Sequence, residues 1–113
     1  MNLSATTLIG DSVKNSQGEN LGDLKEIMLD TTSGKVSYAV LDFGGFLGVG
    51  NKLFAVPWAA LDVDTSDHSL ILNIDKETLK NAEGFDQDDW PNFSDRDFER
   101  RVHDTYSATP YWE

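Results

Sequence analysis

The sequence predicts a mainly β protein: a small barrel of about six short strands with a short helix, followed by a helical, aromatic-rich C-terminal extension. Three observations lead to this prediction. Short runs of alternating apolar residues, separated by turn-forming residues, fill residues 8–74. At Asp75 this alternation gives way to helical spacing. The chain has 113 residues, enough for one domain, and closing its strands into a barrel would remove exposed sheet edges.

The expected strands are bounded by turn residues and lie at residues 11–15, 21–30, 35–43, 52–56, 61–64 and 69–74. Gly18 and Gly34 stand between the first three, because glycine readily adopts the positive φ that turns need. The strand at 35–43 is apolar on both faces, with Tyr38 on one and Leu41 on the other. We therefore expect this strand to be central and covered on both sides.

Helical spacing follows these strands. Asp75 is expected to cap a short helix at residues 76–81, and Ser94 to cap a second helix. In the second helix apolar residues recur every four positions, which gives one apolar stripe made of Phe98, Val102 and Tyr106. On its polar side, Asp97 and Arg101 stand four residues apart and can form an ion pair. Such a pair stabilises a helix by about 0.3–0.5 kcal/mol.

The acidic extension is expected to be ordered. Residues 81–113 carry nine acidic and three basic residues, a charge balance typical of disorder. They also hold seven of the twelve aromatic residues of the chain, whereas disordered segments are poor in aromatics. We therefore divide the chain into a barrel domain, residues 1–80, and an extension, residues 81–113, that packs on the barrel or on a second subunit. The candidate interaction residues are Trp90, Phe98, Tyr106, Tyr111 and Trp112, because aromatic residues are enriched in interfaces.

Composition limits the partners. The net charge is −11, with nine basic and twenty acidic residues. Direct nucleic-acid binding depends on basic side chains, so we expect none, and the same charge repels anionic membranes. It would suit a basic protein partner. The absence of cysteine, of a signal peptide and of a long apolar run leads us to expect a cytoplasmic protein with no membrane insertion.

A glycine-rich loop is the first place to look for chemistry, since Gly44, Gly45, Gly48 and Gly50 stand close together before Lys52. Phosphate-binding loops need a helix after the glycines, but the residues after Lys52 are typical of a strand that ends in proline. We therefore interpret the loop as a flexible or bulged connection between strands.

No other group of residues predicts catalysis. Asp62 to Asp64 begins like a calcium loop but lacks the later glycine and glutamate. His68 is expected in a turn and His103 on the polar side of its helix, both at the surface. No nucleophile, base and orienting group come together, so we expect no catalytic residue, no metal site and no cofactor.

The sequence resembles the PRC-barrel family over about residues 8–80. The most specific part is Gly44-Gly45-Phe46-Leu47-Gly48 followed by Val56-Pro57-Trp58. Weaker support comes from Leu21-Gly22-Asp23-Leu24, Leu29-Asp30, Gly34-Lys35-Val36, Tyr38-Ala39-Val40-Leu41 and Lys52. Trp90-Pro91 and the closing Pro110-Tyr111-Trp112 are similar to the extension of stand-alone bacterial members.

The resemblance implies a small β-barrel that serves binding and assembly and has no catalytic residues. The family occurs in the cytoplasmic domain of the photosynthetic reaction-centre H subunit, in the C-terminal half of a ribosome-maturation factor, and in stand-alone bacterial proteins associated with stress responses. The glycine loop then becomes a barrel corner, and Pro57, before Trp58, the end of a strand. We expect a non-enzymatic protein-interaction module that forms a homodimer. The alternatives are an accessory factor in ribosome maturation or RNA metabolism, and an electron-transfer accessory protein like the H subunit.

Overall fold

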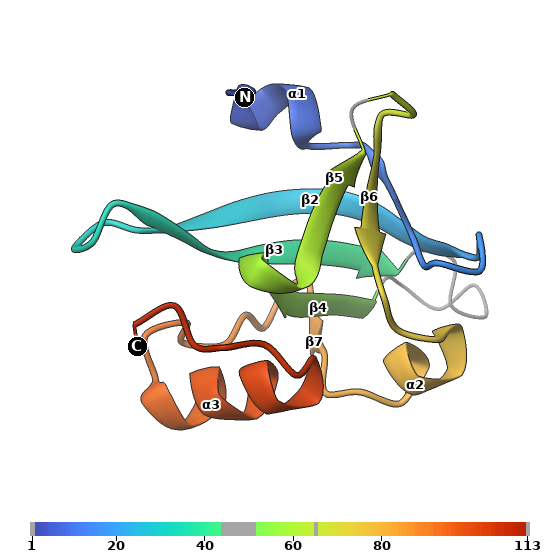
Figure 1. Cartoon of the computed structure of the whole chain (residues 1–113). Coiled ribbons are helices and arrows are strands. Elements are labelled where there is room, and N and C mark those ends of the chain that lie inside the picture. The colour runs from blue at the N-terminus through green and yellow to red at the C-terminus, as the bar shows by residue number, and fades with distance from the viewer. Residues whose placement is uncertain (1, 44–51, 65, 113) are drawn as a thin grey trace.

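The computed structural model of the chain describes residues 2–43, 52–64 and 66–112. These residues form one sheet of seven strands in the order β5-β6-β1-β2-β3-β4-β7 (Figure 1). The strands are β1 (Ser12–Lys14), β2 (Asn20–Asp30), β3 (Lys35–Phe43), β4 (Lys52–Pro57), β5 (Leu61–Asp64), β6 (Ser69–Leu72) and β7 (Phe85–Asp86). The helical elements are α1 (Ala5–Leu8), the 3-10 turn η1 (Trp58–Ala60), α2 (Lys76–Lys80) and α3 (Arg96–Thr105). The predicted fold class, mainly β and barrel-like, is confirmed.

The sheet curls around an apolar interior. Strands β2, β3 and β4 are antiparallel neighbours, and β5 and β6 cross in front of them (Figure 1). Strand β1 closes the arrangement by pairing antiparallel with β2 and parallel with β6. The interior is filled by buried side chains from the strands and the two short helices, namely Leu8, Val13, Leu21, Leu24, Ala39, Leu41, Phe43, Phe54, Val56, Leu70, Leu72 and Leu79.

Strand β3 is central and covered on both faces, as its sequence predicts. It lies between β2 and β4. Leu41 points into the barrel interior, whereas Tyr38 belongs to a second apolar cluster on the other face. Tyr38 is fully buried although it stands outside the barrel interior, because α3 covers this face (Figure 1). The barrel therefore presents one outer wall that the extension completes.

The structure differs from the sequence prediction at several elements. Strand β7 lies in the acidic segment after α2, where the sequence predicted no strand, and pairs with the outer edge of β4. Helix α1 was not expected; it is a single turn capped by Ser4, whose Oγ accepts from the Thr7 amide. Helix α3 begins one residue after Asp95, which takes the capping role that we assigned to Ser94. The 3-10 turn η1 was also not expected, and the remaining elements agree with the prediction to within two residues.

One glycine of the barrel is fixed by a close backbone approach. Gly22 lies in β2 with φ +129°. A Cβ atom at this position would stand 2.1 Å from the carbonyl oxygen of Asp42 on β3. No side chain fits there, and L residues rarely adopt this φ. Both the lack of space for a side chain and the positive φ therefore require glycine at this position.

Candidate interaction surface

The extension is attached to the barrel by an apolar contact. On α3, Phe98 and Val102 are buried against Tyr38 and Ala55, which come from β3 and β4. The Phe98 ring also meets that of Phe93 at 5.7 Å between centroids. Each buried side chain of this size stabilises the contact by roughly 1.5–3 kcal/mol. These contacts are made within one chain.

A buried carboxylate ties the end of the chain to α3. Glu99 is only 1% exposed. Its Oε2 accepts from Arg96 Nη1 at 2.9 Å and its Oε1 accepts from the Tyr111 hydroxyl at 2.7 Å. Burial, together with the hydrogen bond and the charge of Glu99, raises the pKa of Tyr111 to about 12. Both oxygens of the buried carboxylate are thus paired, as a buried charge requires.

His103 is buried, so the expectation that it lies at the surface is wrong. It is 2% exposed, and its ring lies 5.4 Å from that of Tyr38 and 5.1 Å from that of Trp112. Its Nδ1 is 2.7 Å from the backbone oxygen of Glu99. Because a carbonyl oxygen can only accept, Nδ1 carries the proton and donates it. The end of the chain covers this side of α3, which the sequence pattern of the helix alone did not indicate.

We call residues 107–112 the C-terminal strap. The strap begins with the end of α3: Ser107 has φ +54°, and the amide of Ala108 donates to the carbonyl of His103. This is the geometry of a helix that ends in a left-handed residue. The strap then runs back along α3 toward its N-terminal end (Figure 1). Its two aromatic residues, Tyr111 and Trp112, therefore reach the first turns of the same helix.

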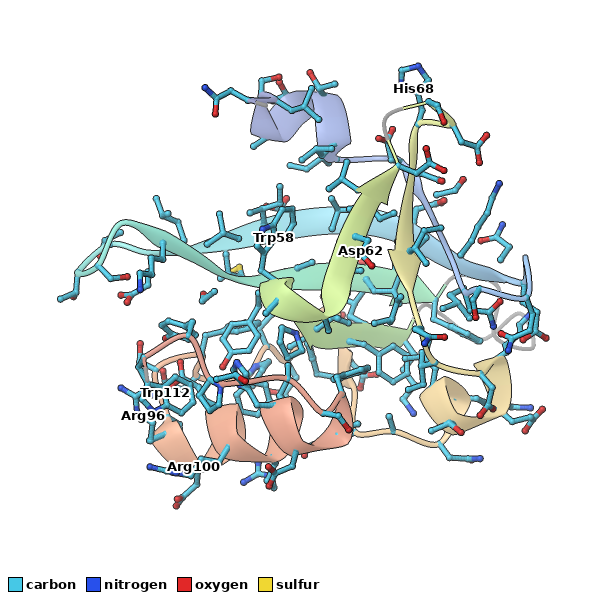
Figure 2. All side chains as sticks on the ribbon, in the orientation of Figure 1. Trp58, Asp62, His68, Arg96, Arg100 and Trp112 are labelled. Atoms are coloured by element: carbon cyan, nitrogen blue, oxygen red, sulfur yellow. The ribbon has the colours of Figure 1, made fainter. Side chains whose placement is uncertain are left out.

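Trp112 stacks on arginine at the surface. The Cζ atom of Arg96 lies 3.9 Å from the centroid of its ring system, and that of Arg100 lies 6.0 Å away. Figure 2 shows these three side chains together at one end of α3, on the opposite side of the molecule from His68. We call them the Trp112 patch. Trp112 is partly exposed, Arg100 is exposed, and the Arg96 side chain is 48% exposed. A guanidinium over an indole face is attracted by the ring quadrupole.

The remaining candidate residues lie elsewhere. Trp90 contacts the ring of Phe85 and donates from Nε1 to the carbonyl of Gln87 at 2.7 Å. Tyr106 packs between the barrel interior and the second cluster. The structure thus brings Phe98, Tyr111 and Trp112 to one end of α3, while Phe98 is internal and only the last two reach the surface.

Sequence analysis missed three of the residues that organise this surface: Arg96, Glu99 and Arg100. The sequence did contain an indication that Glu99 and His103 are buried. Each comes directly after a residue of the apolar stripe, so the two side chains lie on one side of the helix, next to that stripe. The predicted partner of Arg101 also differs. Its guanidinium donates to Glu83 at 3.1 and 3.3 Å, which connects α3 to the segment after α2.

The glycine loop, with Gly44, Gly45, Gly48 and Gly50, lies outside the described residues. The next element along the chain is strand β4, as we expected. Lys52 opens this strand, and its Nζ donates to the carbonyls of Lys80 and Ala82, at 3.1 and 3.2 Å. The ammonium therefore caps the end of α2. A lysine in a phosphate loop would instead need its ammonium directed at a ligand.

A family model for the PRC-barrel domain matches residues 1–79. The chain belongs to the PRC-barrel family. Pro57 is the last residue of β4, and Trp58 begins η1 and packs against the barrel interior. No curated protein matches the chain closely enough to count as a relative.

At the level of the family, a PRC-barrel chain is a protein-interaction or assembly module, and such domains are typically non-catalytic. Within the described part of the chain, no three histidine or acidic side chains are placed to hold a metal ion. Over the same residues, no helix has the length and apolar character needed to cross a membrane.

Proposed function

We propose that this PRC-barrel chain is a protein-interaction module that forms a homodimer through α3 and the Trp112 patch. The observation that carries the proposal is a tryptophan held at the surface by two arginines, Arg96 and Arg100, beside Tyr111. Tryptophan, tyrosine and arginine are the residue types that contribute most binding energy in protein interfaces. Arg96 and Tyr111 are already held by their hydrogen bonds to Glu99, so association would cost less side-chain entropy.

Charge supports the same surface. Two copies of a chain with a net charge of −11 repel each other. Helix α3 is an exception, because its ten residues carry three arginines and three acidic residues, and one of those acids, Glu99, is buried. A contact through α3 therefore brings together surfaces whose exposed charges nearly balance.

The test is the molar mass measured by light scattering after size-exclusion chromatography, over a range of protein concentrations. We expect twice the 12.6 kDa mass of the chain. Arg100→Glu should weaken the dimer at least tenfold, because it reverses an exposed charge beside Trp112. Trp90→Ala is the matched control, since it removes another partly exposed tryptophan of the extension and should leave the dimer unchanged.

A monomeric native chain at all concentrations would refute the homodimer. A dimer that resists Arg100→Glu but dissociates with Trp90→Ala would place the interface elsewhere. Removing the whole extension is a poorer test, because it would uncover Tyr38, which is fully buried beneath α3. Loss of the dimer in such a truncated chain would then result from damage to the fold.

A further inference from the structure

Strand β2 is paired along only part of one edge. Its neighbour β1 pairs with it as far as Asp23, and the last backbone hydrogen bonds on that side are made by Leu24, to Gly10 and Asp11. On the other side, β3 pairs with β2 to its end at Asp30. Residues 25–30 of β2 therefore have a strand on one side, and no strand of the described residues on the other.

The unpaired edge begins at a bulge in β2. Lys25 has no partner in the register between β2 and β3, because Leu24 faces Leu41 and Glu26 faces Val40. Such a bulge bends the strand and commonly ends pairing. Figure 1 shows the β2–β3 hairpin extending beyond β1 and β6 after this point. The far end of the unpaired edge thus lies beyond the other strands, while Ile27 and Met28 still pack on the two apolar clusters.

After Lys25, the side chains on the edge are apolar and acidic. Leu29 is 57% exposed, the highest value among the large apolar side chains of the described residues. Because side chains alternate along a strand, Glu26, Met28 and Asp30 share one face and Ile27 shares the other with Leu29. Glu26 is exposed and faces an apolar residue on β3, whereas Asp30 faces Lys35. Ile27 and Met28 pack partly on the two apolar clusters, so the exposed side chains of the edge are Glu26 on one face and Leu29 on the other.

We propose that this edge of β2 binds an extended segment of a basic partner protein as an added strand. Main-chain hydrogen bonds supply affinity in this mode and alternate side chains supply specificity. The segment that fits has basic residues opposite Glu26 and Asp30 and apolar residues between them.

A second copy of the chain fits the edge less well. Two β2 strands related by a two-fold axis through Met28 would set Glu26 of one copy against Asp30 of the other, and facing like charges are destabilising. An axis through Ile27 would bring no opposite charges together, while each copy carries a net charge of −11. The negative charge of the chain, which repels a second copy, would attract a basic segment.

The experiment titrates the full chain with the capped peptide Gly-Lys-Val-Ile-Val-Lys-Gly, labelled for fluorescence anisotropy, and monitors backbone amide shifts by NMR. We expect binding with amide shifts concentrated at residues 25–30. The peptide with glutamate in place of both lysines should not bind. Glu26→Lys should weaken binding about tenfold, because an attractive cross-strand pair becomes repulsive.

Asp62→Lys is the matched control, since Asp62 is an exposed acid on β5, a strand at an outer edge of the sheet, and the change in net charge is identical (Figure 2). It should leave binding within twofold of the native chain. Equal weakening by both variants would mean that only the overall charge attracts the peptide, which would overturn the proposal, as would absence of binding. Shifts at residues 25–30 that grow with protein concentration without peptide would assign the edge to a second copy instead.

The outcome is independent of the proposed homodimer. Arg100→Glu, which should dissociate the dimer, lies on α3 and should leave peptide binding unchanged.

Discussion

The tyrosines provide a direct test of how the extension is packed. The chain has three tyrosines, and all three contact α3 or the strap: Tyr38 from β3, Tyr106 at the end of α3, and Tyr111 in the strap. Burial raises the pKa of Tyr38, and the charge of Glu99 adds to this effect. Burial alone raises the pKa of Tyr106. The pKa of Tyr111 is raised to about 12.

The prediction concerns the native chain between pH 10 and 11. A free tyrosine has a pKa of about 10, so about nine-tenths of the side chains in an unfolded chain are ionised at pH 11. In the native chain we expect roughly one tenth of Tyr111 and less of the other two. The phenolate absorbance near 295 nm, measured with and without denaturant, gives both values directly.

The same shifts predict a loss of stability in alkali. A phenol whose folded pKa is raised keeps its proton in the native state and loses it in the unfolded state. The unfolded state therefore binds fewer protons, and stability falls as the pH rises above 10. At pH 11 each such tyrosine costs about 1.4 kcal/mol, and the three together cost about 4 kcal/mol. This is a large share of the 5–15 kcal/mol that is typical of a domain.

Urea unfolding at pH 9 and pH 11 measures the loss, and the variants Tyr38→Phe, Tyr106→Phe and Tyr111→Phe separate the tyrosines from other groups that titrate in alkali. Each variant should lose less stability than the native chain over this interval. A native absorbance titration with its midpoint near pH 10 for any of the three would refute the packing from which we reason.

Three further predictions concern stability and are measured by urea unfolding at pH 7. Gly22→Ala should destabilise the chain by about 3–5 kcal/mol, because the added methyl group would meet the carbonyl oxygen of Asp42 at a positive φ; a loss under 1 kcal/mol would contradict this close approach. Ser107→Gly should stabilise it by about 0.5–1 kcal/mol, because glycine adopts the left-handed conformation at no steric cost, whereas Ser107→Ala, the control, should bring no gain. Tyr111→Phe should cost about 1.5–3 kcal/mol, because it leaves the buried Glu99 carboxylate without one of its two donors; an unchanged stability would mean that the strap does not hold this bond in solution.

Much of the barrel could be predicted from the sequence, because its strands have local signatures. The alternation of apolar residues and the turn residues predicted six of the seven strands, with bounds correct to within two residues. The strand around Tyr38 is apolar on both faces, and this pattern identified it as the central strand. Strand β7 could not be predicted. It has two residues, and it exists because Phe85 pairs with Leu53 on β4, a contact between distant parts of the chain. No local pattern specifies such a partner.

The surface residues were harder to predict for a related reason. Glu99 and His103 are polar residues that the pattern of a single helix places near its solvent side. They are buried because the strap folds back over α3 and brings Tyr111 to Glu99 and Trp112 to His103. Burial of this kind depends on tertiary contacts between residues up to twelve positions apart. The sequence indicated that the aromatic residues of the extension would pack, but not which polar groups they would cover.

The extension also determines how the two proposed surfaces relate. The family model ends at residue 79, yet the outer face of β3 and β4 is completed only by α3, which comes later in the chain. Helix α3 covers a face of the sheet, whereas the unpaired edge of β2 lies at the side of β2 away from β3 and β4 (Figure 1). A dimer formed through α3 would therefore leave both β2 edges accessible. Such a dimer would present two sites for extended segments, and a partner with two basic segments would bind it more tightly than either segment alone.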